Sequence, residues 1–415
     1  MAVVVRDRFD RFVRSLFNSA PDGEAGSAAL PTTLAETVRS IDPRCLQSIA
    51  RSTLATQPFL LALEEAQLPE TSLRYVLVHD EIGPAAFVLF TVVQLDLEGL
   101  ASGASEKRNS SRVRLLRRAG KTLQSAGGIE RMVIGGHPLF WGSDFFAFRD
   151  PQPSPSLLAT LVRAGYRLRK LEEIKVSLLK DFTAGEIPLF GPLIRYGYVP
   201  FETQPNMVLN VQPGWRNFGA YLTALSPRYR KAVRERRHAF ESGGFTLERT
   251  RPTPIAAELA ELYANVSARA VTRWVKLTPS FFRSVEDHMR DAFRLWVVRK
   301  DQRIVAFVCA LHDRLPHKGR NRLIGLFLGL DYSLNDEFKL YWNLLYKLVE
   351  EAIDEGFETL DLGRTALQAK AELGAQPEPL HCFIRHRNPS ANALVRLLFD
   401  QLVEPARAPE RHALR

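Results

Sequence analysis

Cysteine is scarce in this chain, with three residues among 415, at positions 45, 309 and 382. They lie far apart and form none of the spacings that bind metals, so the sequence predicts reduced thiols. The nine histidines show no HxxxH or HxH spacing either. These two observations argue against a metal site and favour a cytoplasmic protein.

Long apolar runs are missing as well. The longest, AAFVLFTVV at residues 85–93, is far shorter than the ~20 residues of a membrane span and predicts a buried strand. The opening stretch, MAVVVRDRFDRF, has too short an apolar run for a signal peptide. We therefore expect a cytoplasmic protein, with a peripheral position at the inner face of the membrane as an alternative.

Several catalytic and binding motifs are absent. The sequence contains no GxSxG, which argues against a serine hydrolase. It has no GxGxxG after a strand and no GxxxxGK[ST], so nucleotide hydrolysis has no support. No DNA-binding motif is evident, and DNA is not expected as a partner.

Positive charge is plentiful. The formal net charge is +10, within an ordinary globular composition of 46% hydrophobic and 25% charged residues. This surplus favours a polyanionic partner such as phosphate groups, tRNA or an anionic membrane, although an inert basic surface is the alternative. The length favours two domains.

A repeat links the two halves of the chain. The stretches 73–93 and 293–313 share a hairpin pattern at an offset of 220 residues. Further matches at an offset of 191 pair Arg131 with Arg322 and Gly165 with Gly356. The difference predicts an insertion near 98–128 in the first half. Each half then has the order helices, hairpin, third strand, helix, fourth strand.

The second half shows this order in detail. It predicts helices near 214–243, 254–270 and 279–290, a hairpin at 293–312 and a third strand at 322–330. A long helix at 336–355 should start at Asp336 and end at Gly356, followed by a fourth strand at 358–362.

Three stretches carry a family resemblance: NMVLNVQPGWRNFGAYLTALSPRYRKAVRERRHAFESGGFTLE at 206–248, the hairpin at 293–312, and LDLGRTALQAKAELGA at 360–375. They resemble the GNAT acyltransferase fold present twice, as in Fem-type aminoacyltransferases and BioF-like acetyltransferase domains. The resemblance implies a mixed α/β (α+β) protein of two tandem GNAT-like domains, each a mostly antiparallel mixed sheet flanked by helices. The expected divisions are 1–200, 201–390, and a C-terminal helix and basic tail at 391–415.

The resemblance also implies a place for the chemistry. In this fold the third and fourth strands splay apart, and the acyl thioester lies in the gap. Asp361, Arg364 and Lys370 should line its mouth, with the two basic residues binding a phosphate or carboxylate. An alternative is that Arg364 pairs with Asp361 or caps a helix. Asp361 and Tyr341 are candidate catalytic proton acceptors by position.

A standard pyrophosphate loop is not expected in the second half. The loop LDYSLNDEF at 330–338 has no glycine, and carboxylates at the helix start repel an anion. The first half offers IGGHPLFWGS at 134–143 instead. If a pantetheine-phosphate loop exists, Gly135, Gly136 and His137 should form it.

Two basic clusters are candidate anion sites. The helix predicted from Ser226 and Pro227 carries Arg228, Arg230 and Arg234, which either cradle an anion or form a solvated face. Arg273 belongs to a second cluster, SARAVTRWVK at 267–276, suited to an acceptor carboxylate or phosphate. A core tryptophan with basic neighbours is the alternative.

Two classes of function remain open. The first is an N-acyltransferase that moves an acyl group from acyl-CoA, as a co-substrate and not a permanently bound cofactor, to an amino sugar, amino acid or amino lipid. Within that class, Fem-type transfer from aminoacyl-tRNA in cell-envelope synthesis is the alternative. The second class is a non-catalytic module that binds RNA or an anionic membrane. The amphipathic stretch 391–415 slightly favours a lipid.

Overall fold

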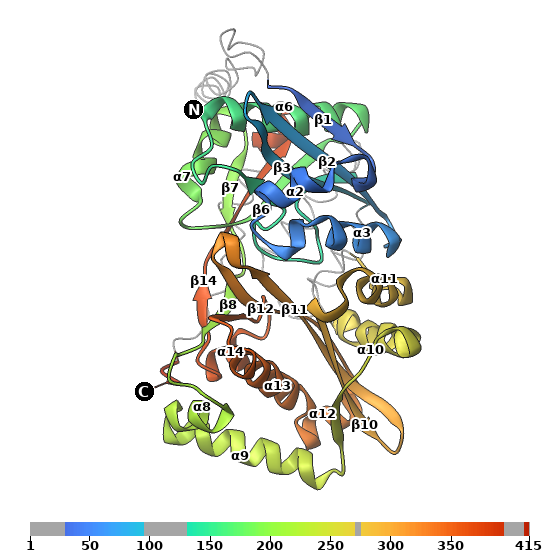
Figure 1. Ribbon diagram of the computed structural model, residues 1–415, viewed down its shortest axis with the longest axis vertical. Helices are drawn as coiled ribbons and strands as arrows, with labels where there is room; N and C mark the ends of the chain where they lie inside the picture. Colours follow the sequence, from blue (N-terminus) through green and yellow to red (C-terminus); the bar gives the residue numbers. More distant parts are fainter. Residues whose placement is uncertain (1–29, 95–130, 270–274, 394–410, 415) are drawn as a thin grey trace, which may run out of the picture. The chain divides into compact units, whose positions relative to one another are not determined.

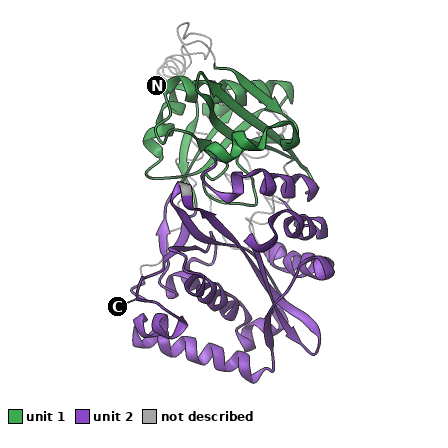
Figure 2. Ribbon diagram, viewed as in Figure 1, with its two compact units in different colours: residues 1–49, 70–203, 380–405 green, residues 50–69, 204–379, 406–415 purple. Residues whose placement is uncertain are grey.

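The computed structural model describes residues 30–94, 131–269, 275–393 and 411–414. They form two compact units (Figure 2). Unit 1 comprises residues 1–49, 70–203 and 380–405, and unit 2 comprises residues 50–69, 204–379 and 406–415. The units therefore interleave in sequence, whereas the sequence analysis divided the chain at 200 and 390. The insertion expected near 98–128 and most of the tail lie outside the described residues.

Unit 1 is built on a mixed sheet. Its strands follow the order β1-β2-β3-β4-β6-β15-β7, with β5 also paired to β3, and β4 with β6 is the parallel pair. Its elements are β1 (Thr32–Ala35), α2 (Pro43–Ile49), β2 (Thr71–Asp80), β3 (Gly83–Gln94), β4 (Arg131–Gly135), β5 (Phe146–Phe148), α6 (Pro155–Leu171), β6 (Val176–Thr183), α7 (Ile187–Phe190), β7 (Val199–Glu202) and β15 (Leu380–His386).

Local sequence explains these elements. The β2–β3 hairpin turns where the Asp80 carboxylate accepts hydrogen bonds from the amides of Ile82 and Gly83. Helix α6 starts at Ser154, whose hydroxyl accepts from the Leu157 amide, with Pro155 at its first position. The hairpin predicted at 73–93 is confirmed.

Unit 2 has a second mixed sheet (Figure 1). Its strand order is β14-β8-β13-β12-β11-β10-β9, and β12 and β13 are parallel. Its elements are α3 (Gln57–Glu65), β8 (Asn206–Asn210), α8 (Phe218–Ala224), α9 (Pro227–Ser242), β9 (Thr246–Arg249), α10 (Ala256–Arg269), α11 (Pro279–Met289), β10 (Phe293–Lys300), β11 (Arg303–Leu315), β12 (Arg320–Leu330), α12 (Tyr332–Phe338), α13 (Leu340–Asp354), β13 (Thr359–Asp361), α14 (Leu367–Glu372) and β14 (Gln376–Glu378).

Both units confirm the predicted fold class of mostly antiparallel mixed sheets flanked by helices. In unit 2 the hairpin and the third and fourth strands lie where they were predicted. The region 214–243 forms two helices, α8 and α9, separated by Leu225 and Ser226, and α9 starts at Pro227 as predicted. Among the described helices, none combines the length and apolar character needed to cross a membrane.

The predicted start of the long helix is wrong. Asp336 lies inside α12, and α13 begins only at Leu340, because Lys339 adopts a left-handed conformation with φ of 55°. The Asn335 side chain accepts a hydrogen bond from the Tyr341 amide and stabilises this break. The end was predicted correctly, since Gly356 follows α13 with φ of 68°.

One predicted pair of the repeat is also wrong. Gly165 lies inside α6, close to Phe90, and does not end a helix as Gly356 does. The unit 1 strand that corresponds to β13 is therefore β6, which begins at Val176, after the end of α6. Arg131 and Arg322 do correspond, because each lies near the start of a strand that pairs in parallel with the next.

Candidate functional site

A gap opens in the unit 2 sheet where β12 and β13 separate. Their parallel pairing ends with Ile324 opposite Asp361, and β12 continues to Leu330. Just beyond this point Leu326 is an extra residue, because Cys309 pairs with Phe327 while Ala310 pairs with Gly325. Among the described residues, no strand pairs with this part of β12 on the β13 side. Such bulges re-aim backbone groups beside active sites.

The chain turns sharply after β13. Gly363 has φ of 73°, and two residues with side chains follow in the left-handed region, Thr365 with φ of 64° and Ala366 with φ of 45°. This conformation is costly for a β-branched residue and persists only where the surroundings enforce it. We call residues 361–366 the β13 corner.

Lys370 of α14 is hydrogen-bonded to this corner. Its side chain is buried, and its ammonium donates to the carbonyl of Gly363 at 3.1 Å and to that of Arg364. Burial lowers the pKa of Lys370 to about 7, against the opposing effect of the Asp361 charge. Near neutral pH the site therefore contains a lysine that is easily deprotonated.

Asp361 joins Lys370 to a chain of buried charges. One oxygen of Asp361 accepts from the Gly363 amide at 3.0 Å, and the other lies 3.5 Å from Arg322. Arg322 in turn donates to Asp313 at 2.7 Å. We call Asp313, Arg322, Asp361 and Lys370 the charge chain. It crosses β11, β12, β13 and α14.

The far end of the charge chain is anchored by a distant segment. Asp313, which is fully buried, accepts from the Thr53 amide at 2.6 Å and from the Ser52 hydroxyl at 3.1 Å. These residues precede α3, 260 positions earlier in the sequence. The sequence analysis missed Asp313 and Arg322. Their signal was the charged residues in HDRL at 312–315 and RNRL at 320–323, next to apolar strands.

The structure brings Asp361, Arg364 and Lys370 together at the corner, as the sequence analysis expected. The Lys370 ammonium, however, donates to main-chain carbonyls, whereas it was predicted to face a substrate phosphate or carboxylate. Tyr341 is placed differently. Leu348 lies where a side chain on Gly325 would contact it, beside the Asp361 carbonyl. Tyr341 lies two turns of α13 before Leu348, about 10 Å nearer the start of the helix. Burial raises its pKa, so the phenol stays protonated near neutral pH, and the predicted role in proton acceptance stays a prediction.

The starts of α12 and α13 are closed by side chains. Asp331 accepts from the Ser333 amide at 3.0 Å and ends next to Arg303. Hydrogen bonding to Ser333 lowers the pKa of the Asp331 carboxyl, which keeps it negative. The Asn335 side-chain oxygen accepts a hydrogen bond from the Tyr341 amide at 2.9 Å. These helix starts offer an incoming pyrophosphate a carboxylate, in keeping with the expectation from the sequence.

Gly135, Gly136 and His137 lie at the end of β4, in the corresponding place of unit 1. A Cβ on Gly135 would lie 2.7 Å from Leu179, and the Gly136 amide donates to Leu89 at 2.8 Å. Burial lowers the pKa of His137 to about 3, so it is neutral. These contacts are structural, and a phosphate-binding role for the three residues stays a prediction.

Aromatic rings fill the space beyond β4 in unit 1. Phe146 lies against Gly135, 5.1 Å from the Phe182 ring of β6, and Phe182 lies 3.8 Å from Phe190. Aromatic side chains are therefore packed at the place in unit 1 where β4 and β6 separate.

The basic helix α9 is largely engaged inside unit 2. Arg230 donates to three carbonyls at the end of α8, of which the Leu222 carbonyl is 2.9 Å away. Arg236 pairs with Glu372 at 2.8 Å. Arg228 and Arg234 remain exposed. Arg273 lies outside the described residues, and its predicted role stays a prediction.

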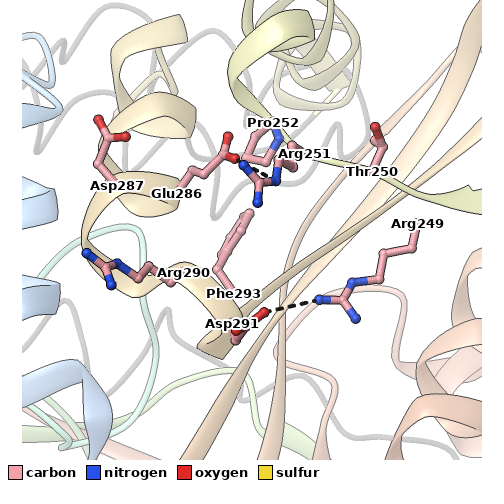
Figure 3. A pocket seen from close by; sticks show the side chains of 9 residues that line it. All are labelled: Arg249, Thr250, Arg251, Pro252, Glu286, Asp287, Arg290, Asp291 and Phe293. Carbon is pink, nitrogen blue, oxygen red and sulfur yellow. Dashed lines mark ion pairs between the residues drawn. The ribbon is translucent and has the colours of Figure 1, made fainter.

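A pocket of about 900 Å³ lies at the opposite edge of the unit 2 sheet (Figure 3). Ion pairs connect its walls, with Arg249 3.6 Å from Asp291 and Arg251 3.7 Å from Glu286. Two strands, β11 and β12, lie between β13 and β10, the strand at this pocket. The pocket is thus separate from the corner, and its acidic and basic side chains offset one another.

Comparison with known proteins identifies the second half. Residues 227–371 match the family model of the acetyltransferase (GNAT) domain. The chain carries a GNAT domain. The match includes the gap between β12 and β13 and ends just after Lys370, and it confirms the predicted acyltransferase class. No curated protein matches the sequence of this chain.

Several solved structures are similar to this chain, and FemX is similar in fold. FemX is similar over 88% of this chain and 100% of its own chain, at 11% identity and a TM-score of 0.53. The C-terminal domain of a putative lysylphosphatidylglycerol synthetase from Agrobacterium fabrum has 12% identity over 88% and 98% of the two chains, with a TM-score of 0.47. A tandem GNAT protein from the clavulanic acid biosynthesis pathway has 11% identity over 86% and 99%, with a TM-score of 0.46.

Proposed function

We propose that this GNAT protein transfers an acyl group from an activated thioester or ester to an amine, at the β13 corner of unit 2. The observation that carries the proposal is Lys370. It is buried at the mouth of the gap, and its pKa of about 7 suits a group that exchanges protons at neutral pH.

The chemistry follows from this arrangement. The acceptor amine attacks the acyl carbonyl, and uncharged Lys370 takes the proton that the amine loses as the C–N bond forms. Asp361 favours the resulting ammonium. Amides of β12 beyond Ile324 stabilise the oxyanion of the tetrahedral intermediate. When the intermediate collapses, the donor sulfur or oxygen leaves and takes this proton from the Lys370 ammonium, which returns Lys370 to its uncharged form.

Unit 2, not unit 1, is the proposed place of catalysis. The corresponding space in unit 1 holds Phe146, Phe182 and Phe190. His137 and Lys180 are buried there, and Lys180 pairs with the adjacent Asp181. A donor thioester would have to displace these side chains.

The donor in the leading version is acyl-CoA, and the acceptor is an amino sugar, amino acid or amino lipid. Arg364, half-buried at the corner, and the exposed Arg228 and Arg234 of α9 are the proposed contacts for anionic groups of the substrates. No permanently bound cofactor or metal is required by this chemistry.

Aminoacyl-tRNA is the second candidate donor, as the Fem-type resemblance implies. The closed starts of α12 and α13 favour it, because Asp331 and Asn335 occupy the amides that would otherwise hold a CoA pyrophosphate. An aminoacyl ester on tRNA needs no such cradle.

Thermal unfolding with CoA, with acyl-CoAs of rising chain length and with charged tRNA separates the donors. A ligand at 100 times its dissociation constant adds about 2.7 kcal/mol of stability. Donors that stabilise the protein are then tested for transfer to amines, with Lys370→Met and the exposed Lys318→Met compared. We expect Lys370→Met to abolish transfer and Lys318→Met to retain it. Binding of tRNA or anionic vesicles without transfer of any acyl group would replace the proposal by a non-catalytic module.

A further inference from the structure

A second charged cluster lies in unit 1. Arg169, in the last turn of α6, has only 5% of its surface exposed. Its Nη1 has no hydrogen-bond partner among the described residues, and no described carboxylate forms an ion pair with it. Arg74 and Arg131 of the same unit differ, since both pair with Glu172.

The surroundings of Arg169 are themselves cationic. Burial lowers the pKa of Arg169, and repulsion from Arg385 and Arg387 of the β15 end lowers it further. Burial also lowers the pKa of His386, and repulsion from Arg169 and Lys175 lowers it further. The favourable neighbours of Arg169 are two phenols, those of Tyr198 and of Tyr166, whose ring centre is 5.0 Å from the guanidinium.

The topology of unit 1 brings these groups to one end of the sheet. The Ile174 amide donates to the Arg169 carbonyl at 2.9 Å, so α6 ends beside the start of β6. Strand β15 runs antiparallel to β6 and places Arg385 opposite Ser177. The Ser177 hydroxyl donates to the Tyr198 phenol oxygen at 3.2 Å, which leaves the phenol hydrogen available as a donor.

A structural role alone does not explain this cluster. A guanidinium cannot lose its proton at any ordinary pH, so burying it without an anion is unfavourable. Cations do stabilise the end of a helix, but Lys170 of the same turn does so while exposed. Placing Arg169 in the interior beside two more arginines adds repulsion that only a negative charge can offset.

We propose that Arg169, Arg385 and Arg387 form a binding site for a phosphate group. The planar guanidinium of Arg169 matches two phosphate oxygens, and the Tyr198 phenol donates to a third. Arg387 is exposed and Arg385 half-buried, so the group enters from the surface. A phosphate monoester, with nearly two negative charges, offsets the three arginines better than a carboxylate does. The proposal is independent of acyl transfer in unit 2.

Inorganic phosphate is the first probe. Its binding to the full chain is measured by calorimetry and by thermal unfolding, at constant ionic strength set with sodium chloride. We expect saturable binding and a rise in the midpoint for the wild type. The control Arg167→Gln changes an exposed arginine of the same helix and should behave like the wild type. Arg385→Gln should bind at least about tenfold more weakly, because one charge-assisted contact is lost. Arg169→Met should lose the response.

The result that overturns the proposal is a phosphate response equal in the wild type and in Arg169→Met, or no wild-type response beyond that of chloride. If Arg169→Met does not fold, the double variant Arg385→Gln and Arg387→Gln takes its place under the same criterion.

Two further probes identify the source of the phosphate. One is glycerol 3-phosphate in solution, and the other is flotation with phosphatidylcholine vesicles that contain phosphatidic acid. Tight binding of the soluble ester that depends on Arg169 indicates a phosphorylated small molecule. Arg169-dependent flotation indicates a lipid head group. The site is overturned if neither glycerol 3-phosphate nor the vesicles bind in a way that depends on Arg169.

Discussion

The charge of the buried Lys370 is balanced by main-chain carbonyls and by a carboxylate. Its ammonium donates to two main-chain carbonyls, and the negative charge of Asp361 also acts on it. Asp361 is itself shared with Arg322, and Arg322 with Asp313. The protonation of Lys370, on α14, therefore depends on side chains of β13, β12 and β11.

Opposite substitutions along the charge chain should move the pH dependence of transfer in opposite directions. Activity requires uncharged Lys370, so the rate should rise with pH through its pKa of about 7. Asp361→Asn removes the anion that favours the ammonium, which lowers the pKa and shifts the rise to lower pH. Arg322→Gln removes a cation and shifts the rise to higher pH. Each shift should be about one pH unit.

The profiles of kcat/KM against pH check this prediction. The other charged groups near the site are Arg364 at the corner and the Arg236–Glu372 pair on α9 and α14, and both variants leave them in place. Two shifts in the same direction, or a lower rate with an unmoved profile, would show that Asp361 and Arg322 only support the fold.

Lys370 should also make stability depend on pH. Its pKa is about 7 in the folded protein, against an ordinary value of 10.5 for a lysine in water, so between these values the unfolded chain binds more protons. Stability from this group is therefore lost as pH falls towards 7 and regained as pH rises towards 10. Relative to Lys370→Met, the wild type should gain about 1 to 4 kcal/mol between pH 7 and pH 10. Urea unfolding of both proteins at the two values measures the gain; a constant difference would contradict it.

At the scale of elements, the β13 corner combines a short strand, a strained turn and a short helix. Thr365 has a branched side chain at φ of 64°. The strain is compensated by the Lys370 contacts with Gly363 and Arg364. Strain held in this way keeps a corner in one conformation.

Replacing Thr365 by glycine should separate stability from activity. The substitution removes the strain and should stabilise the protein by about 1 kcal/mol, while a looser corner lowers the rate of transfer. The control Thr223→Gly, inside helix α8, should instead destabilise by about 0.5 kcal/mol, because glycine is the poorer helix former. Thermal unfolding and a transfer assay measure both. An unchanged rate in Thr365→Gly would mean that the strain has no part in the reaction.

The sequence predicted those features of these elements that depend on neighbouring residues. Apolar runs with charged turns located both hairpins, and Gly363-Arg364 after an apolar run located the corner. The break at Lys339 was missed because no glycine or proline marks it. The contact of Ser52 with Asp313 joins segments too far apart for any local pattern to show. Arg169 was missed because the pairing of Gly165 with Gly356 ended the helix before it, whereas α6 continues through Arg169 to Leu171.

At the scale of the whole molecule, each unit is completed by a segment from the other half of the sequence. Strand β15 lies between β6 and β7 in unit 1. In unit 2, α3 is held to α11 by the Ser284 hydroxyl, which donates to the Ala62 carbonyl at 2.8 Å. Dividing the chain near residue 203 would remove a central strand from one unit and a packed helix from the other.

A proline in β15 should therefore affect a sheet that is formed mainly by the first half. Ile384 pairs with Leu178 of β6 and with Val199 of β7. Ile384→Pro removes a ladder amide from a central strand and should destabilise unit 1 by about 3 kcal/mol or more. Hydrogen exchange should accelerate at β6 and β7, while β12 of unit 2 provides the internal control. Equal protection of β6 in both proteins would contradict the role given to β15.

The position of β15 in the sequence has a consequence for synthesis on the ribosome. Strand β7 ends at Glu202, and β15 begins only at Leu380. At 5 to 20 residues per second, the nascent chain waits roughly 10 to 40 s with the edges of β6 and β7 unpaired. Open edges invite pairing with other chains, so this interval is when chaperones matter most to this protein. A premature stop codon just before Leu380 would therefore damage a sheet whose other strands are all made by residue 202.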